Sequence, residues 1–322
     1  MLFVFRNQIM NRWRSNGFKV VALLIGIVCV AVPAVVGQNA DKSAPQGLAI
    51  NTEADEDNPH SVPMKGQQGS YRIYYNRKKD EKDGGKIDLY VATWSKTKKA
   101  WAAEELVGPQ VESKGHDSCC FVTQYGAYPQ TIWFATTKSA ANPRFDLYGA
   151  VRDLPPSSSG EHRVFSGVRA LTTVDTEAED ETHPWITKDL KSMYFTRGNK
   201  DKARIAVATR KTIEGPRGFE EPKIIDELPE GYCHATLTPD GATMYLQGPR
   251  EGGGTALYRT RKTGSLWGKP SALKNLNHPE AKWDGSPNLS RDGASLYFSS
   301  DRPGGKGGLD IYVIPVANIK SD

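Results

Sequence analysis

Cysteine is scarce in this chain, with four residues among 322. Cys29 lies in an N-terminal apolar run, which leaves Cys119, Cys120 and Cys233 in the rest of the chain. Three thiols cannot all pair with one another, so a framework of disulfides is excluded as the basis of the fold. A single bridge from Cys233 to Cys119 or Cys120 stays open as an alternative to buried free thiols.

An excess of one charge is also missing from most of the chain. The formal net charge is +5, and Arg6, Arg12, Arg14 and Lys19 contribute +4 of it, so the remainder carries 5 − 4 = +1. A balanced surface offers no basic footprint for nucleic acid. The pI of about 8.8 therefore reflects the N-terminus, and no nucleic-acid partner is expected.

A long apolar run is present at residues 20–36, after the basic residues and before Gln38-Asn39-Ala40. This order of basic, apolar and polar segments is typical of a secretory signal. The run is close to the shortest length that spans a bilayer, so an uncleaved anchor in the inner membrane is the alternative. We expect residues 1–37 to be a signal peptide or signal anchor and residues 38–43 a linker. The rest should be periplasmic or extracellular, and should touch a membrane only through this segment if it is retained.

Helical periodicity is lacking after residue 43, and a β-type unit recurs instead. Its clearest copy has a short strand at 284–290, an Asp292-Gly293 turn, an aromatic strand at 296–300, a glycine-rich loop and a third strand at 310–313. The aromatic anchors of the second strands are Tyr74, Trp133, Tyr194, Tyr245 and Tyr297, spaced by 59, 61, 51 and 52 residues. Four short strands repeated at this period are typical of propeller blades, which bury their faces by stacking around an axis.

The last copy ends too early to include a fourth strand. Residues 44–48 repeat the proline-to-aliphatic spacing of Pro270 to Leu273 and of Pro222 to Ile225, which belong to outer strands. We therefore predict an all-β fold over residues 44–320, a five-bladed β-propeller of four-stranded antiparallel blades. An N-terminal strand closes the last blade and removes an open sheet edge.

The run Ser286-Pro287-Asn288-Leu289-Ser290-Arg291-Asp292-Gly293 resembles the WD40-like (PD40) repeat of TolB and related bacterial envelope proteins. This resemblance implies a propeller in the cell envelope. TolB itself resembles a six-bladed propeller preceded by an α/β domain, whereas the repeat count here is five and no such domain precedes it. The resemblance therefore implies fold and compartment, without establishing TolB's role.

Two aligned slots of the repeat are candidates for a ligand site. The slot just before the Pro287 position holds Asn58, Cys119, His183, His234 and Ser286. Two residues earlier the slot is mostly acidic and holds Glu56, Asp117, Glu181, Tyr232 and Asp284. The first strand of each blade lines the axis, so each set should form a ring around one mouth of the channel, where converging polar groups favour ligand binding. The acids have a second interpretation, as acceptors of backbone N–H groups in inter-blade turns.

Metal binding and glycan chemistry are the alternatives that these slots raise. His183, His234 and Cys233 are ligand types that zinc and copper prefer, although their spacing matches no familiar metal motif. Glu56, Asp117, Glu181 and Asp284 could supply an acid and a nucleophile or base, but such a pair needs unlike environments. Trp94 and Trp283 lie near predicted strand ends, where exposure is favoured over packing between blades.

No catalytic sequence motif is visible, and no cofactor is predicted apart from a metal. The sequence thus favours a non-enzymatic module of the envelope that binds a protein or a glycan through the channel-mouth face. A ligand- or metal-binding propeller with a His/Cys axial site, and a glycan-active propeller enzyme with axial carboxylates, are the two alternatives.

Overall fold

The computed structural model describes residues 43–79, 85–123, 130–138, 144–152 and 164–320. The predicted signal segment lies outside these residues, so export and the boundary at residue 37 stay predictions. Within the described part of the chain, no helix is long and apolar enough to span a membrane. The described residues belong to one compact unit.

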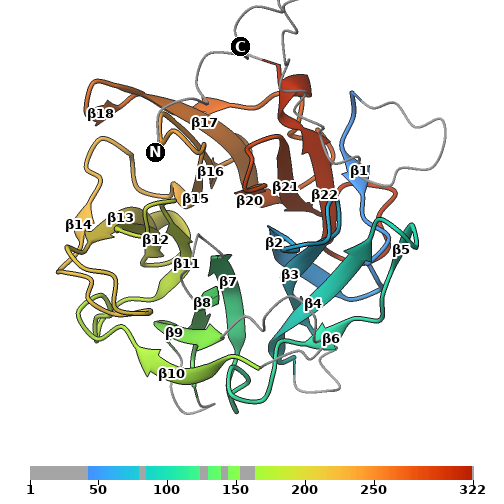
Figure 1. Cartoon of the computed structure of the whole chain (residues 1–322). Coiled ribbons are helices and arrows are strands. Elements are labelled where there is room, and N and C mark those ends of the chain that lie inside the picture. Colours follow the sequence, from blue (N-terminus) through green and yellow to red (C-terminus); the bar gives the residue numbers. More distant parts are fainter. Residues whose placement is uncertain (1–42, 80–84, 124–129, 139–143, 153–163, 321–322) are drawn as a thin grey trace, which may run out of the picture. The chain divides into compact units, whose positions relative to one another are not determined.

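Five antiparallel sheets surround a central axis in chain order (Figure 1). The first contains β2 (Asp55–Pro63), β3 (Tyr71–Lys78) and β4 (Ile87–Ser95), with β5 (Ala100–Trp101) and β6 (Glu105–Leu106) both paired to β4. The second contains β7 (Asp117–Thr123), β8 (Gln130–Thr136), β9 (Asp146–Arg152) and β10 (Ser166–Ala170). The third contains β11 (Glu181–Ile186), β12 (Ser192–Arg197), β13 (Arg204–Thr209) and β14 (Lys223–Ile224).

The fourth sheet contains β15 (Cys233–Leu237), β16 (Thr243–Pro249) and β17 (Thr255–Thr263), with β18 (Leu266–Trp267) and β19 (Ser271–Ala272) both paired to β17. The fifth contains β20 (Asp284–Leu289), β21 (Ser295–Ser300), β22 (Asp310–Pro315) and β1 (Gln46–Gly47). Two short 3-10 turns, η2 (Lys200–Lys202) and η3 (Val316–Asn318), complete the described elements. The predicted five-bladed propeller is confirmed.

The N-terminal strand closes the ring as predicted. In β1, Gln46 lies opposite Val313 and Gly47 opposite Tyr312 of β22. The pairing continues past the strand, because Leu48 N–H donates to the Ile311 carbonyl at 2.9 Å. The amide of Asn51 spans the same residue, with its Oδ1 and Nδ2 each 3.0 Å from the Ile311 backbone. The N-terminal strand β1 thus completes blade five and pairs with the outer edge of β22, which would otherwise be open.

The core consists of five apolar clusters, one at each interface between neighbouring blades. Each aromatic anchor of the repeat enters a different cluster, and all five anchors are buried: Tyr74, Trp133, Tyr194, Tyr245 and Tyr297. A single four-stranded sheet cannot bury both of its faces, so each blade gains its core from its two neighbours. The first strands β2, β7, β11, β15 and β20 contact one another around the axis, where the predicted site residues lie.

Candidate functional site at the channel axis

A β-bulge interrupts the first strand of every blade at the same place. Between β2 and β3 the register shifts after Asp57 and resumes at His60, and equivalent shifts occur in β7, β11, β15 and β20. The bulged residues have φ angles between 49° and 54°: Asn58, Cys119, His183, His234 and Ser286. A positive φ is unfavourable for residues other than glycine, and a bulge commonly re-aims a side chain at a functional position.

Polar side chains from the preceding blade satisfy several of the bulged backbone N–H groups. Cys119 N–H donates to Asn76 Oδ1 at 3.3 Å, His234 N–H to Thr196 Oγ1 at 2.9 Å, and Ser286 N–H to Gln247 Oε1 at 2.9 Å. Since a buried backbone donor without a partner costs free energy, these second-strand residues allow the bulges to persist.

The bulged side chains converge, as the slot alignment predicted. His183 is the hub, with Nε2 2.5 Å from Asn58 Oδ1 and 3.3 Å from Cys119 Sγ. Its ring stacks on that of His234, with centroids 3.1 Å apart and planes inclined by 16°. Ser286 Oγ lies 3.4 Å from His234 Nδ1. The five residues therefore form one polar ring made from all five blades.

The ring leaves little free space at the axis. The cavity that its residues line has a volume of about 30 Å³. This holds about two water molecules and no sugar or peptide group. A ligand as large as a sugar must therefore bind outside the ring, and the role of the ring residues as ligand contacts stays a prediction.

The two histidines are neutral at physiological pH. Burial lowers the pKa of His234 to about 3. Burial, and secondly the proximity of His234, hold the pKa of His183 well below its usual range. A neutral imidazole accepts or donates one hydrogen bond at each nitrogen, which suits the short contact between His183 and Asn58.

The thiols do not support the metal interpretation or the disulfide. Cys119, Cys120 and Cys233 are all buried and free. Burial raises the pKa of Cys120 and of Cys233 to about 12, and that of Cys119 further. In the described residues, the group of potential metal ligands that lies within 4.8 Å is Asp146, Asp175 and Glu181, and it contains none of His183, His234 and Cys233.

The acids of the second slot are held inside inter-blade turns. Glu56 accepts Thr52 N–H at 2.8 Å and pairs with Arg77 Nε at 2.7 Å. Glu181 accepts Thr176 N–H at 3.1 Å and pairs with Arg197 Nε at 3.0 Å. Each arginine lies opposite its acid on the second strand.

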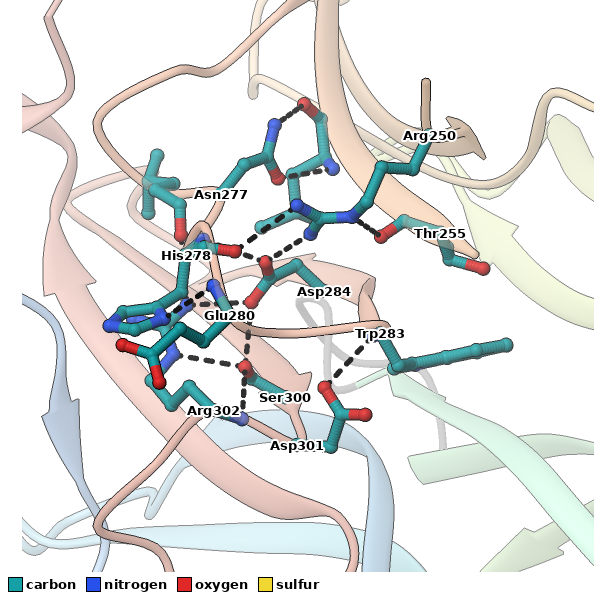
Figure 2. Close-up of polar contacts among 12 residues, drawn as sticks. Arg250, Thr255, Asn277, His278, Glu280, Trp283, Asp284, Ser300, Asp301 and Arg302 are labelled. Atoms are coloured by element: carbon teal, nitrogen blue, oxygen red, sulfur yellow. Dashed lines mark hydrogen bonds and ion pairs between the residues drawn. The ribbon is translucent and has the colours of Figure 1, made fainter. Parts of the chain in front are cut away.

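Asp284 has the densest of these networks (Figure 2). Its two oxygens accept the His278 N–H at 2.8 Å and the Ser300 hydroxyl at 2.6 Å, and pair with Arg250 at 2.5 Å and Arg302 at 2.8 Å. Glu56, Glu181 and Asp284 have no solvent-exposed surface. The turn interpretation of this slot therefore describes their geometry, and substrate cannot reach them without rearrangement.

Asp117 is the exception, because a threonine replaces the arginine opposite it. Its Oδ2 accepts Ser113 N–H at 2.7 Å, and its cross-strand neighbour is Thr136. Within the described part of the chain its Oδ1 is buried and has no hydrogen-bond partner. Burial raises the pKa of Asp117. A cavity of about 490 Å³ adjoins Ser113 and Thr136 between blades one and two.

Asp175, with Asp146 and Glu181, forms the acidic group near the start of blade three. Asp175 occupies the place of Asn51 and Asn277, whose side chains bond both the N–H and the carbonyl of Ile311 and Leu257. Asp175 Oδ1 likewise accepts the Leu147 N–H at 2.8 Å. Burial raises the pKa of Asp175 to about 7, so below neutral pH the protonated carboxyl replaces the neutral amide found in the other two blades.

Replacing Asp175 with asparagine should stabilise the protein above neutral pH. The folded-state pKa lies above the unfolded one, so wild-type stability falls as pH rises from about 4 to about 7. We expect Asp175→Asn to add about 2 kcal/mol at pH 8, less than the full shift of the pKa because the side chain is partly exposed. Below pH 4 the gain should vanish. Urea unfolding at pH 4, 6 and 8 measures this, and an equal effect at all three values would contradict it.

Asp57 is a functional candidate that the sequence analysis missed. It precedes the ring member Asn58, and its Oδ1 accepts the Asn58 N–H at 2.7 Å. Burial is the main cause that raises the pKa of Asp57, and the negative charge of Asp55 adds to it; the hydroxyls of Ser299 and Ser286 oppose the rise. The signal was present in the repeat, because this slot holds Asp57, Ser118, Thr182, Cys233 and Gly285, with a single carboxyl.

Comparison with known proteins gives matches among solved structures alone. No protein-family model matches the chain, and no curated protein matches it. The α-L-arabinofuranosidase of Podospora anserina in complex with cellotriose is similar with a TM-score of 0.57 at 10% identity, over 85% of this chain and 94% of that one. A family-43 endo-arabinanase from Bacillus licheniformis gives 0.56 at 13% identity, over 82% and 96%. A β-xylosidase/α-arabinofuranosidase from a compost metagenome gives 0.54 at 12% identity, over 84% and 95%.

These neighbours correct three expectations from the sequence. The resemblance to TolB and the WD40-like (PD40) repeat is wrong as a relationship, because these three similar structures are glycoside hydrolases. The prediction of a non-enzymatic envelope module is wrong for the same reason, as is the prediction that the chain is no enzyme. The physical cause of the error is that blade repeats encode packing between sheets, which binding modules and enzymes share. At this identity the likeness itself shows the fold.

Proposed function

We propose that the chain is a glycan-active enzyme that hydrolyses glycosidic bonds, with Asp57 as the proton donor at the channel mouth. The observation that carries the proposal is the position of Asp57, whose carboxylate accepts the N–H of the ring member Asn58 at 2.7 Å and whose pKa is raised by burial. The fold similarity to arabinofuranosidases, xylosidases and arabinanases supports the reaction class. The four acids of the second slot are not chosen, since three are paired with arginines and none has exposed surface.

Glycoside hydrolysis needs two carboxyl groups in unlike environments, one protonated and one ionised. Asp55 and Asp57 are two residues apart on β2 and so lie on the same face of the strand. Burial raises the pKa of Asp57, and the negative charge of Asp55 adds to this rise. Asp55 accepts the Leu309 N–H at 3.0 Å and is partly exposed. We assign Asp57 as general acid and Asp55 as the base or nucleophile.

The test is hydrolysis of aryl α-L-arabinofuranosides and β-D-xylosides, together with arabinan and xylan. Asp57→Asn should lower the initial rate at least about 100-fold, the usual contribution of a general acid. The rate of the wild type should fall at high pH as Asp57 loses its proton. Asp240→Asn is the matched control, because Asp240 lies in an exposed turn between β15 and β16. Absence of turnover on the whole panel, or an Asp57→Asn variant with wild-type rates, would reject the proposal.

A further inference from the structure

Trp283 is the tryptophan whose packing the fold does not explain. Seven tryptophans occur in the chain, and six of them lie in the described residues. Five of the six join the inter-blade clusters: Trp94, Trp101, Trp133, Trp185 and Trp267. Trp94 is thus buried and the expectation of its exposure was wrong, whereas Trp283 joins none of the five clusters and is partly exposed.

Hydrogen bonding does not account for this side chain either. Among the described residues the indole Nε1 of Trp283 is buried and has no acceptor. No ring stacks on Trp283 and no cation lies over it in that part of the chain, although most other aromatic side chains have such partners. An unsatisfied indole N–H destabilises a fold, and Trp283 belongs to none of the five apolar clusters whose packing could offset this cost. The residue is therefore better explained by binding than by stability.

The backbone holds Trp283 firmly at the start of β20. Its N–H donates to Asp301 Oδ1 at 2.9 Å, and its carbonyl accepts the Asp301 N–H at 3.1 Å. Figure 2 shows the indole extending away from the network around Asp284. The side chain is thus fixed at its base and free of the arginines beside it.

Gly285 gives the indole its place beside the ring. A Cβ at this position would lie 2.5 Å from Gln247 Oε1, 2.8 Å from Trp283 Nε1 and 3.1 Å from Trp283 Cε2. The equivalent residues in the other blades all carry side chains: Asp57, Ser118, Thr182 and Cys233. The glycine therefore lets the indole edge lie against the inner strand, next to Ser286, whose hydroxyl acts on Asp57.

We propose that Trp283 is the stacking platform for a sugar ring of the glycan substrate, placed beside Asp57 at the channel mouth. The C–H face of a pyranose or furanose ring packs on a flat indole, and nearby carboxyl and hydroxyl groups bind the sugar hydroxyls. The small axial cavity excludes a sugar from the ring itself, so the substrate must lie across the mouth. This assignment rests on the proposed glycosidase function and adds its substrate contact.

Binding of xylotriose, cellotriose and an arabino-oligosaccharide tests the assignment. Calorimetry uses the full chain with Asp57→Asn, so that no turnover disturbs the titration. Trp283→Ala in that background should weaken binding of the preferred sugar at least about tenfold, and Trp283→Phe should retain most of it. Trp283→Phe should also remove the fluorescence change that the sugar causes. Trp101→Ala is the matched control, because Trp101 lies on the outer strand β5 and packs against Trp94.

Unchanged affinity in Trp283→Ala, or no binding of any of the three sugars, overturns the platform. The two proposals fail in different ways. If Asp57→Asn abolishes hydrolysis while Trp283→Ala keeps the wild-type KM, the platform is wrong and the enzyme stands. If sugar binding needs Trp283 but Asp57→Asn hydrolyses at the wild-type rate, the platform stands and the assignment of the acid is wrong.

Discussion

Asp284→Ala should lower the free energy of unfolding by about 3–5 kcal/mol, because removing one partner of a buried ion pair leaves the other charge buried and unpaired. The carboxylate has no exposed surface, and its partners Arg302 and Arg250 are 9% and 16% exposed. Removing it leaves two guanidinium groups in a poorly solvated turn, together with the unpaired His278 N–H and Ser300 hydroxyl (Figure 2). Urea denaturation at pH 7 measures the change.

Two further variants separate the cause of this loss from a general loss of packing. Glu280→Ala removes an exposed carboxylate from the same loop and should leave the midpoint unchanged. Arg302→Met added to Asp284→Ala should restore part of the lost stability, because the stranded charge is then gone. Arg302 stacks over Phe298 and Tyr312 at 4.8 and 4.7 Å, so methionine can retain part of that packing. A loss below about 1 kcal/mol for Asp284→Ala would show that the network does not stabilise the turn.

The fold could be predicted because its signal is repeated. Each aromatic anchor sits at the same place in a strand, so each enters a different inter-blade cluster, and an error in one copy is corrected by the other four. The closing strand could be predicted because the last copy was incomplete and residues 44–48 matched the missing part. Alignment of the copies also predicted the convergence of His183 and His234, since equivalent residues of a propeller lie at the same distance from its central axis.

The chemistry of the site depends on what differs between the copies and on partners from other strands. Arg77 and Arg197 neutralise Glu56 and Glu181 from the far end of the second strand, and no local pattern pairs them. Asp57 was overlooked because the residues aligned with it differ in type from blade to blade. A catalytic acid is needed only once in the ring, so a single carboxyl in such a varied slot was itself a signal. The alternative of a glycan-active enzyme with axial carboxylates agrees with the function proposed above, but three of the acids that it named are paired with arginines in inter-blade turns.

Acid should destabilise this protein in part through the stacked histidines. The folded-state pKa of His234 is about 3 and that of His183 lies well below its usual range, whereas both approach 6.5 in the unfolded chain. The unfolded state therefore binds more protons between pH 6.5 and 3, so this contribution is present above pH 6.5 and is lost as pH falls. For His234 alone the loss by pH 4 is about 3 kcal/mol.

Other buried groups titrate in the same pH range. The contribution of the two histidines is therefore measured as the difference in unfolding free energy between the wild type and a variant without them. The lowered pKa of His60 adds to the loss of stability in acid. The raised pKa values of Asp57, Asp117 and Asp175 instead increase stability as the pH falls. The variant His183→Gln/His234→Gln retains polar groups that can bond Asn58 and Ser286 but cannot be protonated. Its unfolding free energy, subtracted from that of the wild type at each pH, should change by about 3 kcal/mol or more between pH 7 and pH 4. A flat difference would mean that the imidazoles open to solvent and accept protons without unfolding the ring.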